Sequence, residues 1–520
     1  MDFLIAVGNI LLFLIVLSVV ICIHELGHFF FAKKAGVLCH EFSFGMGPKI
    51  WSKKKGETTF SIRAIPFGGF VSMSGEEVQA EVVKVGQKIR LGFAKDGEIN
   101  RIIINPAHLD YQDYLEVTID SIDLQGRDQT RLYINEYTVK RDAYFVFDKN
   151  QMQIAPYDRN FSTKTKIQRF LITFGGPMMN FILAFFVYLF IALTLGVANT
   201  SSTVVGDVSS GMPASEILLP GDIILSINDE EVSAWTSSDE SLITINSELA
   251  KYLTYDSFVF EVERDGEILT LEPIIPQYIF YALGFTSSVD TTDLIIGSPL
   301  YVSSELLAGD KILSINGEIF ANWNEIITYA IAYTEGSTEE NPTTITVERD
   351  GVEYTFTYVA YGTNVLDAMG YSAFYSRIGI AGTTKFSLFG SFENAFLSFK
   401  ESALSIYKTL YLLFSSKQIG VGDLSGFIGI YTMTANAASQ GFYTLLSWVG
   451  LLSVNLGIVN LLPIPALDGG RLVFIGYEAI TKKKPNQKFE NLLHTIVFFL
   501  LIALLIFVTY NDILRLFGLD

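Results

Sequence analysis

Two histidines and a glutamate in one short segment form the pattern with the clearest chemical meaning in this sequence. His24-Glu25-Leu26-Gly27-His28 lies near the end of an apolar run that covers residues 3–32. On a helix the two imidazoles, four residues apart, project from nearly the same face, and Glu25 lies close to whatever they bind. Neutral imidazoles suit Zn²⁺, and a carboxylate beside the metal can take a proton from a water whose pKa the metal lowers. The spacing therefore predicts a zinc hydrolase site with Glu25 as the general base.

The surroundings of this motif are as informative as its spacing. Imidazole and carboxylate groups are expensive in hydrocarbon and are rarely kept there without a partner or a task. The alternative, a chance pentapeptide or histidines satisfied inside a helix bundle, is weaker here than it would be in a soluble helix. We therefore expect a metal site inside a membrane-spanning helix.

Hydropathy indicates which elements must position these residues. With 520 residues, 50% of them hydrophobic, 41 phenylalanines and a mean hydropathy of +0.36, the chain is too apolar for a soluble protein and too long for one domain. Apolar stretches at residues 3–32, 170–197, 445–462 and 492–509 predict four transmembrane helices, and residues 392–414 form a weaker amphipathic run. Because the first stretch follows Asp2 instead of a basic start and contains the metal motif, we expect it to be retained and not cleaved as a signal peptide.

A single carboxylate after the third apolar stretch is the candidate for a third metal ligand. Catalytic zinc takes three protein ligands and keeps one position open. Pro463, Pro465 and the glycines that follow Asp468 break the helix and expose backbone where Asp468 can face a site. Asp468 could instead cap the following helix or pair with Arg471. With the first motif present, we predict that Asp468 joins His24 and His28.

The distribution of charge predicts the orientation in the membrane. Residues 33–169 contain 21 Lys or Arg and 17 Asp or Glu, whereas residues 201–385 contain 6 basic and 28 acidic residues, a net charge of −22. Because positive residues that flank spans stay cytoplasmic, we expect residues 33–169 inside, and both termini and the acidic segment outside. The acidic surface also argues against nucleic acid as a partner.

The acidic segment contains an internal repeat. Residues 219–228 (LPGDIILSIN) recur as residues 307–316 (LAGDKILSIN), and residues 262–266 (VERDG) recur as residues 347–351. These repeats resemble PDZ domains of bacterial proteases, in whose circularly permuted form the peptide-binding strand comes last and adds a peptide to the sheet edge. The residues at the matching positions are Leu283, Gly284, Phe285, Ile378, Gly379 and Ile380. Alternatively, the glycines only make turns in modules that act as a steric filter.

Taken together, these motifs resemble the site-2 protease family of intramembrane zinc metalloproteases, specifically the regulator-of-sigma-E type. Residues 41–48 (EFSFGMGP) and 65–71 (IPFGGFV) match the stretches that form a membrane-reentrant β-loop in that family, and residues 175–180 (GGPMMN) match the start of its second span. The resemblance implies zinc held by His24, His28 and Asp468, with Glu25 as general base. It also implies contact with the substrate at Asn455, Asn460, Gly45, Gly47, Gly68 and Gly69.

The resemblance also implies what is cleaved. Its members cut single-span membrane proteins inside the membrane, which releases a regulatory domain, such as one restraining a sigma factor, or clears remnant signal peptides. A pair of PDZ domains outside the membrane would admit only substrates that another protease has already shortened. The insert at residues 81–162 resembles the Gram-positive members, so the physiological pathway stays open.

These observations predict a polytopic α-helical membrane protein of the bacterial plasma membrane with a membrane-reentrant β-loop and two extracytoplasmic PDZ-like α+β domains. The expected divisions in the first half are a transmembrane helix with the zinc motif (1–34), a cytoplasmic region with the β-loop and a β-rich insert (35–166), and a second transmembrane helix (167–198). The two PDZ-like domains (199–288 and 289–384) come next, followed by an amphipathic helix and linker (385–443), a third transmembrane helix with the Leu-Asp-Gly motif (444–471), and a cytoplasmic loop with the fourth transmembrane helix (472–520). The expected partners are the lipid bilayer and single-span substrates; the oligomeric state is left open.

Other classes of protein share part of this pattern. A PDZ-bearing membrane scaffold without proteolysis would keep the repeats but has no need for two histidines and two carboxylates in apolar surroundings. A metal transporter would require inverted repeats and polar groups at the midplane of several spans, and the sequence has neither. A soluble serine protease is excluded because the remaining histidines, His40, His108 and His494, have no nucleophile elbow within reach.

Overall fold

The computed structural model describes residues 2–76, 82–107, 109–126, 131–147, 150–289, 292–300, 305–369, 371–415 and 420–516. The chain divides into two compact units. The first unit consists of Met1–Val187 and Ile430–Leu504, and the second of Tyr188–Gly429 and Leu505–Asp520. Each unit therefore combines a long stretch of chain with a segment from near the C-terminus.

Within the described residues, four helices are long and apolar enough to cross a membrane, as the hydropathy pattern predicted. They are α1 (Asp2–Lys34), α2 (Lys166–Leu195), α8 (Phe442–Leu461) and α10 (Gln487–Leu516). At 1.5 Å per residue, the 20 residues of α8 span about 30 Å, which is the thickness of the hydrocarbon core. The third span thus ends at Leu461, earlier than the expected residue 471. The two prolines that follow lack an amide donor, and a separate helix, α9 (Asp468–Thr481), begins after them.

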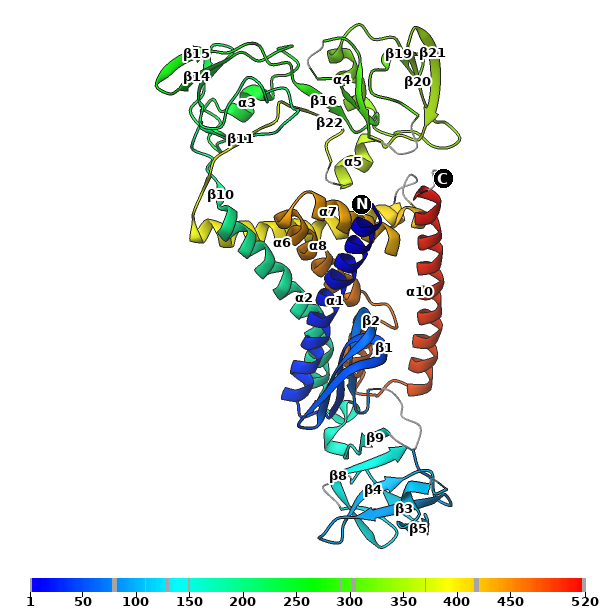
Figure 1. The fold of residues 1–520 in the computed structure, drawn as a ribbon. Helices are drawn as coiled ribbons and strands as arrows, with labels where there is room; N and C mark the ends of the chain where they lie inside the picture. The colour runs from blue at the N-terminus through cyan, green and yellow to red at the C-terminus, as the bar shows by residue number, and fades with distance from the viewer. Residues whose placement is uncertain are drawn as a thin grey trace. The chain divides into compact units, whose positions relative to one another are not determined.

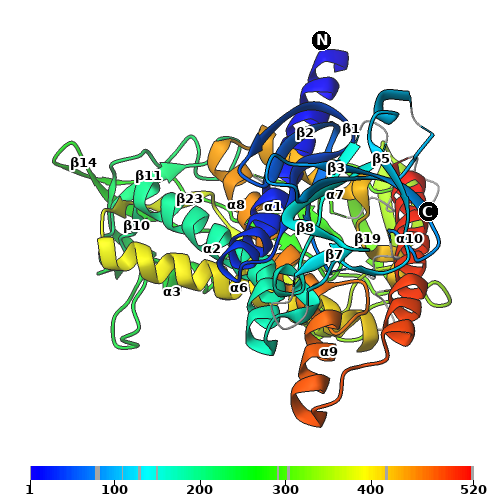
Figure 2. The ribbon, with the colours of Figure 1, turned by 90° about the horizontal axis from the view of Figure 1, so that it is seen from below.

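A small antiparallel sheet, made of two long strands, lies along α1 (Figures 1 and 2). The strands are β1 (Cys39–Lys55) and β2 (Thr58–Met73). The first part of β1 pairs with both parts of β2, since Phe44 faces Ile62 on one side and Gly69 on the other. Both strands therefore fold back on themselves, and the segment around Gly69 forms an outer edge of the sheet.

The turn between β1 and β2 is held by charge. The Arg159 guanidinium donates two hydrogen bonds of 2.7 Å to the Glu57 carboxylate, and Lys33 at the end of α1 also pairs with it. These bonds, with that from Arg159 the strongest, lower the pKa of Glu57 to about 2. The end of the insert is thereby fastened to the end of the first span.

In its described part, the insert between the sheet and α2 is itself a β-structure of seven strands, in agreement with the β-rich prediction. Its strand order is β5-β3-β4-β8-β7-β6, and β9 pairs with β8. The strands are β3 (Lys88–Phe93), β4 (Ile99–Ile103), β5 (Leu115–Thr118), β6 (Ile122–Asp123), β7 (Leu132–Ile134), β8 (Tyr137–Phe147) and β9 (Asn150–Gln153). Its interior is formed by fully buried aliphatic residues such as Ile89, Ile99 and Ile102.

The second unit contains two modules that repeat the same β pattern. The first module has β11 (Val205–Val208), β12 (Ile223–Ile227), β13 (Glu230–Glu231), α3 (Ile245–Leu249), β14 (Phe260–Arg264), β15 (Glu267–Thr270) and β23 (Ile380–Gly382). The second module has β16 (Gln277–Phe280), β17 (Phe285–Ser287), β18 (Ile296–Pro299), β19 (Lys311–Ile315), α4 (Trp323–Ala332), β20 (Thr343–Arg349), β21 (Val352–Tyr358), α5 (Thr363–Met369) and β22 (Phe374–Arg377).

The same buried ion pair occurs in both modules and explains the repeated Gly-Asp and Glu-Arg phrases. Asp222 accepts two hydrogen bonds from Arg264 and one from the Leu219 amide. Asp310 accepts the equivalent bonds from Arg349 and from the Leu307 amide. Burial would raise the pKa of each aspartate, but the arginine and the amide outweigh burial and lower it.

The second module is inserted into the first, which differs from the expected boundary at residues 288 and 289. β16 pairs with β22 inside the second module, whereas β23, which follows β22 directly, pairs with β11 of the first module. The cores agree with this pairing, because Ile378 belongs to the cluster around Phe258 and Phe260. The two repeats are thus nested and not consecutive.

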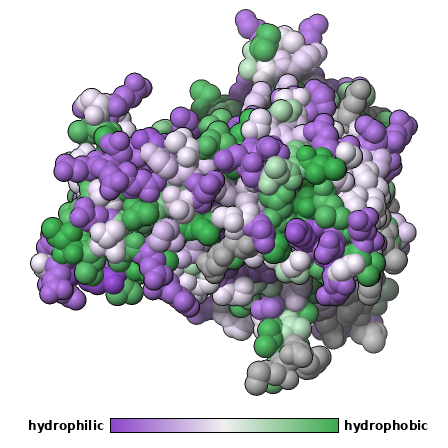
Figure 3. Space-filling model, turned by 90° about the horizontal axis from the view of Figure 1, so that it is seen from above, coloured by the Kyte–Doolittle hydropathy of each residue, from purple (hydrophilic) through white to green (hydrophobic). Residues whose placement is uncertain are grey.

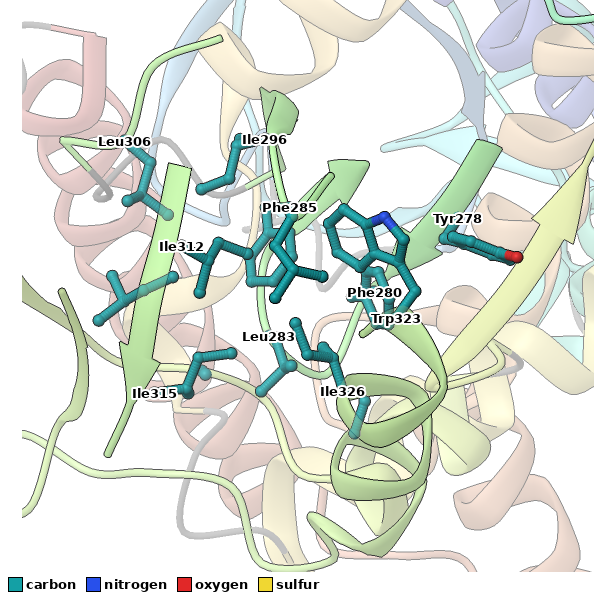
Figure 4. Close-up of a cluster of buried hydrophobic side chains, with 14 of the residues drawn as sticks. Tyr278, Phe280, Leu283, Phe285, Ile296, Leu306, Ile312, Ile315, Trp323 and Ile326 are labelled. Atoms are coloured by element: carbon teal, nitrogen blue, oxygen red, sulfur yellow. The ribbon is translucent and has the colours of Figure 1, made fainter. Parts of the chain in front are cut away.

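Aromatic residues fill the core of the second module (Figure 4). The Phe280 ring stacks on Trp323, with the ring centroids 5.5 Å apart, and also contacts Phe285 and Phe374. Phe280, Leu283 and Phe285 are fully buried. The segment predicted to form a peptide groove, residues 283–285, is therefore interior in this module.

Two short strands and two helices connect the modules to the membrane spans. β10 (Val197–Ala198), which follows α2, pairs with β24 (Thr384–Lys385), which precedes α6 (Leu388–Ser415); α7 (Phe427–Ser439) comes next. The Ser391 hydroxyl donates to the Ala192 carbonyl at 3.1 Å, and the hydroxyls of Tyr188 and Ser402 are 2.7 Å apart. The amphipathic run is thus a helix that packs on the last turns of the second span.

Candidate metal centre

The metal motif lies at a close crossing of α1 and α2. A Cβ atom at Gly27 would lie 2.0 Å from the Gly175 carbonyl oxygen, and one at Gly176 would lie 2.4 Å from His28 Nε2. Only glycine permits such contacts, because real Cβ atoms essentially never approach within 3.0 Å. The glycines in residues 175–176 therefore let the two imidazoles rest directly on the backbone of α2.

Three side chains that can ligate a metal converge at this crossing. The Nε2 atoms of His24 and His28 are 3.1 Å apart, and Asp468 Oδ2 lies 3.1 Å from the first and 3.4 Å from the second. The histidines are 6% and 8% exposed, so the cluster is shielded from solvent. Among the described residues no other group of three His, Cys, Asp or Glu side chains comes together in this way.

The separations of these three atoms fit a zinc ion. Tetrahedral zinc with bonds of about 2.0–2.1 Å places its ligand atoms about 3.3–3.4 Å from one another. The observed 3.1, 3.1 and 3.4 Å lie within about 0.3 Å of that spacing. Asp468 Oδ2 is also buried without a hydrogen bond inside the described part of the chain, a costly state for an oxygen that lacks a cation.

The second span fixes the outer nitrogens of both imidazoles. His28 Nδ1 is 2.8 Å from the Ile172 carbonyl oxygen, which can only accept, so Nδ1 carries the proton and Nε2 presents its lone pair. His24 Nδ1 is 3.3 Å from the side-chain amide of Asn180. These contacts were not predicted from the sequence, although Asn180 ends the Gly-Gly-Pro-Met-Met-Asn phrase that resembles the start of the family's second span.

A non-helical link carries Asp468 to the site. Ala466 has a positive φ of 78°, and its amide donates a 2.7 Å hydrogen bond to His494 Nδ1 in α10. Asp468 opens α9 without a capping bond, and Arg471 pairs with Glu76 at 2.5 Å. Neither alternative role of Asp468, helix cap or partner of Arg471, therefore occurs in the structure.

Strand β2 borders Glu25. A Cβ at Gly69 would lie 3.7 Å from Glu25 Cγ, and the Val71 amide lies within hydrogen-bonding reach of the Glu25 carboxylate. The Ser18 hydroxyl donates a 2.5 Å bond to the Pro66 carbonyl, which fastens β2 to α1 further along. The edge of the sheet thus runs beside the carboxylate that follows His24.

Among the described residues, the other residues predicted at the substrate site form no hydrogen bond to the three converging side chains. Gly45 and Gly47 pack against Ile65 within the β-sheet, and Gly68 approaches Met46. On α8, Asn455 is exposed and Asn460 is half-buried, and within the described residues neither forms a hydrogen bond to the cluster. Gly69 is thus the one predicted glycine that reaches the metal motif's surroundings.

The two segments predicted to bind peptide differ in whether neighbouring strands leave an edge free. β17, which begins at Phe285, is paired on one side with β16 and on the other with β18, and Leu283 and Gly284 lie in the turn between β16 and β17, so this segment offers no free edge to an added strand. β23 is paired with β11 alone among the described strands. The prediction of a groove at residues 283–285 is wrong for this structure, because neighbouring strands occupy both edges.

Comparison with known proteins agrees with this geometry. A model of the family described as Peptidase family M50 matches residues 12–504. The chain belongs to this family. It is 31% identical over 519 residues to the zinc metalloprotease RasP of Shouchella clausii, covering 98% of this chain and 100% of that protein. It is also 31% identical over 524 residues to the regulator of sigma-W protease RasP of Bacillus subtilis, covering 98% and 99%.

These similarities extend over the modules as well as the spans, because the relatives match over nearly their whole length. The M50 protein described here is a zinc metalloprotease, as the sequence predicted. The four candidate spans within the described residues fit a membrane protein of this family. The expected site-2 protease family is thus confirmed, and the relative from Bacillus subtilis is named for sigma-W, whereas the sequence pattern resembled the regulator-of-sigma-E type.

Proposed function

We propose that this protein is an intramembrane endopeptidase that cuts the membrane segments of single-span proteins at a zinc held by His24, His28 and Asp468. The convergence of three ligand atoms from helices more than 400 residues apart in sequence, in a candidate membrane span, carries the proposal. Zinc bound there would lower the pKa of a coordinated water and polarise the scissile carbonyl.

The protein's own residues supply the proton transfers and the positioning. Glu25 accepts the proton of the attacking water and returns it to the leaving nitrogen of the cut peptide bond. The Ile172 carbonyl keeps the proton of His28 on Nδ1 throughout, so Nε2 stays available as a ligand. Burial of both imidazoles excludes bulk water, which strengthens these electrostatic interactions.

The β-sheet beside Glu25 is the proposed docking place for the substrate strand. A peptide bond in a helix is shielded by the surrounding turns, so the substrate must unwind, and an unwound strand can pair with the sheet edge that contains Gly69. Ile65 and Met46 are 52% and 44% exposed at one end of the sheet, whereas lysines gather at the other end around residues 53–55. The change from exposed apolar side chains at one end to lysines at the other supports a loop that re-enters the membrane. Gly45, Gly47, Gly68, Asn455 and Asn460 would contact substrate only once it is bound.

The nested modules resemble PDZ domains, and we infer that they restrict access to the site. Hydrophilic side chains are spread over the face of the molecule drawn in Figure 3, between smaller groups of hydrophobic ones, as an aqueous location requires. Ile378, Gly379 and Ile380 remain the candidate peptide groove. Because one of the two sheet edges predicted to bind peptide is covered by neighbouring strands, a steric filter is favoured over recruitment of substrate by both modules.

The proposed orientation places both termini and the modules outside the plasma membrane. It rests on the lysines and arginines that flank the spans at residues 33–34, 164–169 and 482–484. Exposed aromatic and apolar side chains on α6 also support a boundary between membrane and water along this helix. They are Phe389, Phe392, Phe396, Leu404, Tyr407, Tyr411 and Phe414. Their spacing forms one face of a helix that packs on the last turns of α2, where interfacial lipid would cover it.

The roles at the metal are tested by zinc content and cleavage of a single-span reporter substrate. Glu25→Gln should keep zinc and lose essentially all cleavage, because a general base is not a ligand. His24→Ala, His28→Ala and Asp468→Ala should lose both. Cleavage by Glu25→Gln would remove the assigned base, and full zinc occupancy in Asp468→Ala would remove the third ligand.

The filter is tested by deleting residues 203–382 and joining the ends with a short flexible linker. β10 and β24, which flank the deleted segment on either side, are paired at the usual strand spacing of about 5 Å, so a short linker can join the remaining ends. If the modules filter, the deleted protein should keep zinc and cut full-length substrates that the intact protein refuses. Slower cleavage of pre-trimmed substrates would instead support recruitment.

The orientation is tested by labelling with an impermeant thiol reagent. Ser210 and Ser52 are both exposed, and each would be replaced by cysteine in a protein whose own two cysteines have been removed. The cysteine at position 210 should react in intact cells and that at position 52 should not. The reverse pattern would overturn the proposed orientation.

A further inference from the structure

Asn180 is a buried amide that no assigned role explains. It lies on α2 and is fully buried, with its side-chain nitrogen 3.3 Å from His24 Nδ1. Its side-chain oxygen has no hydrogen-bond partner in the part of the chain that the structure describes. A buried polar atom without a partner costs free energy and calls for an explanation.

The protonation of His24 gives the Asn180 oxygen a partner. His24 Nε2 points at His28 Nε2 and Asp468, so a metal at this point takes the Nε2 lone pair and leaves the proton on Nδ1. A protonated Nδ1 is a donor and needs an acceptor. The two ends of a carboxamide have nearly the same shape, so a half-turn of the Asn180 amide places its unpaired oxygen at Nδ1.

We propose that Asn180 is a positioning residue that accepts the Nδ1–H of His24 and so directs the Nε2 lone pair to the metal. The arrangement matches that of the second histidine, whose Nδ1 meets the Ile172 carbonyl. Asn180 and Ile172 both lie on α2, so one span orients both imidazoles of another. The Asn180 backbone is held in turn, because its carbonyl accepts a 2.9 Å bond from the Ser453 hydroxyl of α8.

This inference rests on the proposed zinc ligands, and its test separates the two. Zinc affinity of the purified full-length protein would be measured by competition with a chelator in wild type, Asn180→Leu, Asn180→Asp and Ser453→Ala. Leucine has a similar size but no acceptor, so zinc should bind about 10- to 100-fold more weakly. Aspartate is a stronger acceptor for Nδ1–H, so its variant should bind zinc at least as tightly as wild type.

Ser453→Ala is the matched control. It removes a buried hydrogen bond next to Asn180 and leaves the side-chain amide in place, so zinc affinity should stay within twofold of wild type. A merely structural role for Asn180 would lower thermal stability in both Asn180→Leu and Asn180→Asp without separating their zinc affinities. That result, or unchanged affinity in a folded Asn180→Leu, would overturn the proposal.

The His24→Ala variant shows whether a failed prediction concerns the zinc ligands or only the role of Asn180. If His24→Ala loses zinc while Asn180→Leu keeps full affinity, only the role of Asn180 is wrong. If His24→Ala itself keeps zinc, the ligand set is wrong. A second readout, the ¹⁵N chemical shifts of histidine in the zinc-loaded protein, should show the Nδ1–H tautomer at His24 in wild type and its loss in Asn180→Leu.

Discussion

Gly176→Ala adds one methyl group at the point where both imidazoles rest on α2. The new carbon would lie 2.4 Å from His28 Nε2 and 2.8 Å from His24 Cε1. Ordinary contacts of a Cβ atom begin near 3.4 Å, so one ring must retreat by about 1 Å along the line to Nε2. The atoms displaced are those that converge with Asp468.

We expect a large effect on the rate of cleavage and a small effect on the stability of the fold. A displacement of about 1 Å at a reacting centre can cost about 100-fold in rate. Alanine is also a better helix former than glycine, by up to about 1 kcal/mol, so α2 itself gains. We expect Gly176→Ala to fold, to bind zinc more weakly and to cleave a single-span reporter about 100-fold more slowly.

The assay compares zinc content, reporter cleavage and thermal unfolding in detergent. Gly8→Ala, on the other helix of the crossing, is the matched control, because a Cβ there has nothing within 4 Å. It should leave zinc and cleavage unchanged. Wild-type zinc content and cleavage in Gly176→Ala would refute the argument that the rings rest on the α2 backbone.

Three further outcomes follow from packing and charge elsewhere. Gly27→Ala, whose Cβ would lie 2.0 Å from the Gly175 carbonyl oxygen, should force α1 and α2 apart and lower the thermal unfolding temperature, unlike Gly176→Ala; equal melting of the two variants would argue against this close crossing. Glu57→Gln should destabilise the protein at neutral pH. Because the pKa of Glu57 falls from its ordinary 4.5 to about 2 in the folded state, its stabilisation is complete above pH 4.5 and disappears as the pH falls toward 2, so wild type and variant should melt alike at the acid end. Asp310→Ala breaks a pair whose carboxylate is 1% exposed and should cost roughly 3 kcal/mol in an unfolding titration, where a loss under 1 kcal/mol would contradict its structural role.

The parts of the protein that depend on local patterns could be predicted from the sequence. Apolar runs long enough to cross a bilayer gave four spans, because hydropathy over about 20 residues is a property of the run alone. The i, i+4 spacing placed His24 and His28 on one face, and the broken helix before Asp468 gave that carboxylate the freedom to reach them. The repeated strands were also visible, since each module carries its own ion pair and hairpin.

The pairing of strands that lie in different modules could not be predicted from local patterns. Nothing local distinguishes nested modules from consecutive ones, since β22 and β23 are adjacent in sequence and yet pair in different modules. The same holds for the contribution of α2 to the site. A backbone carbonyl at Ile172 has no sequence signature, and the meaning of Gly176 appears only once an imidazole is seen against it.

The ligands of zinc can be identified in the purified protein. X-ray absorption at the zinc edge should show imidazole nitrogens and a carboxylate oxygen at about 2.0–2.2 Å, with no sulfur. Asp468→Ala should lose the metal, whereas Glu25→Gln should give a spectrum with the wild-type ligand set. A sulfur shell at about 2.3 Å, which only Cys22, Cys39 or a methionine could supply, or an unchanged spectrum in Asp468→Ala, would contradict the account.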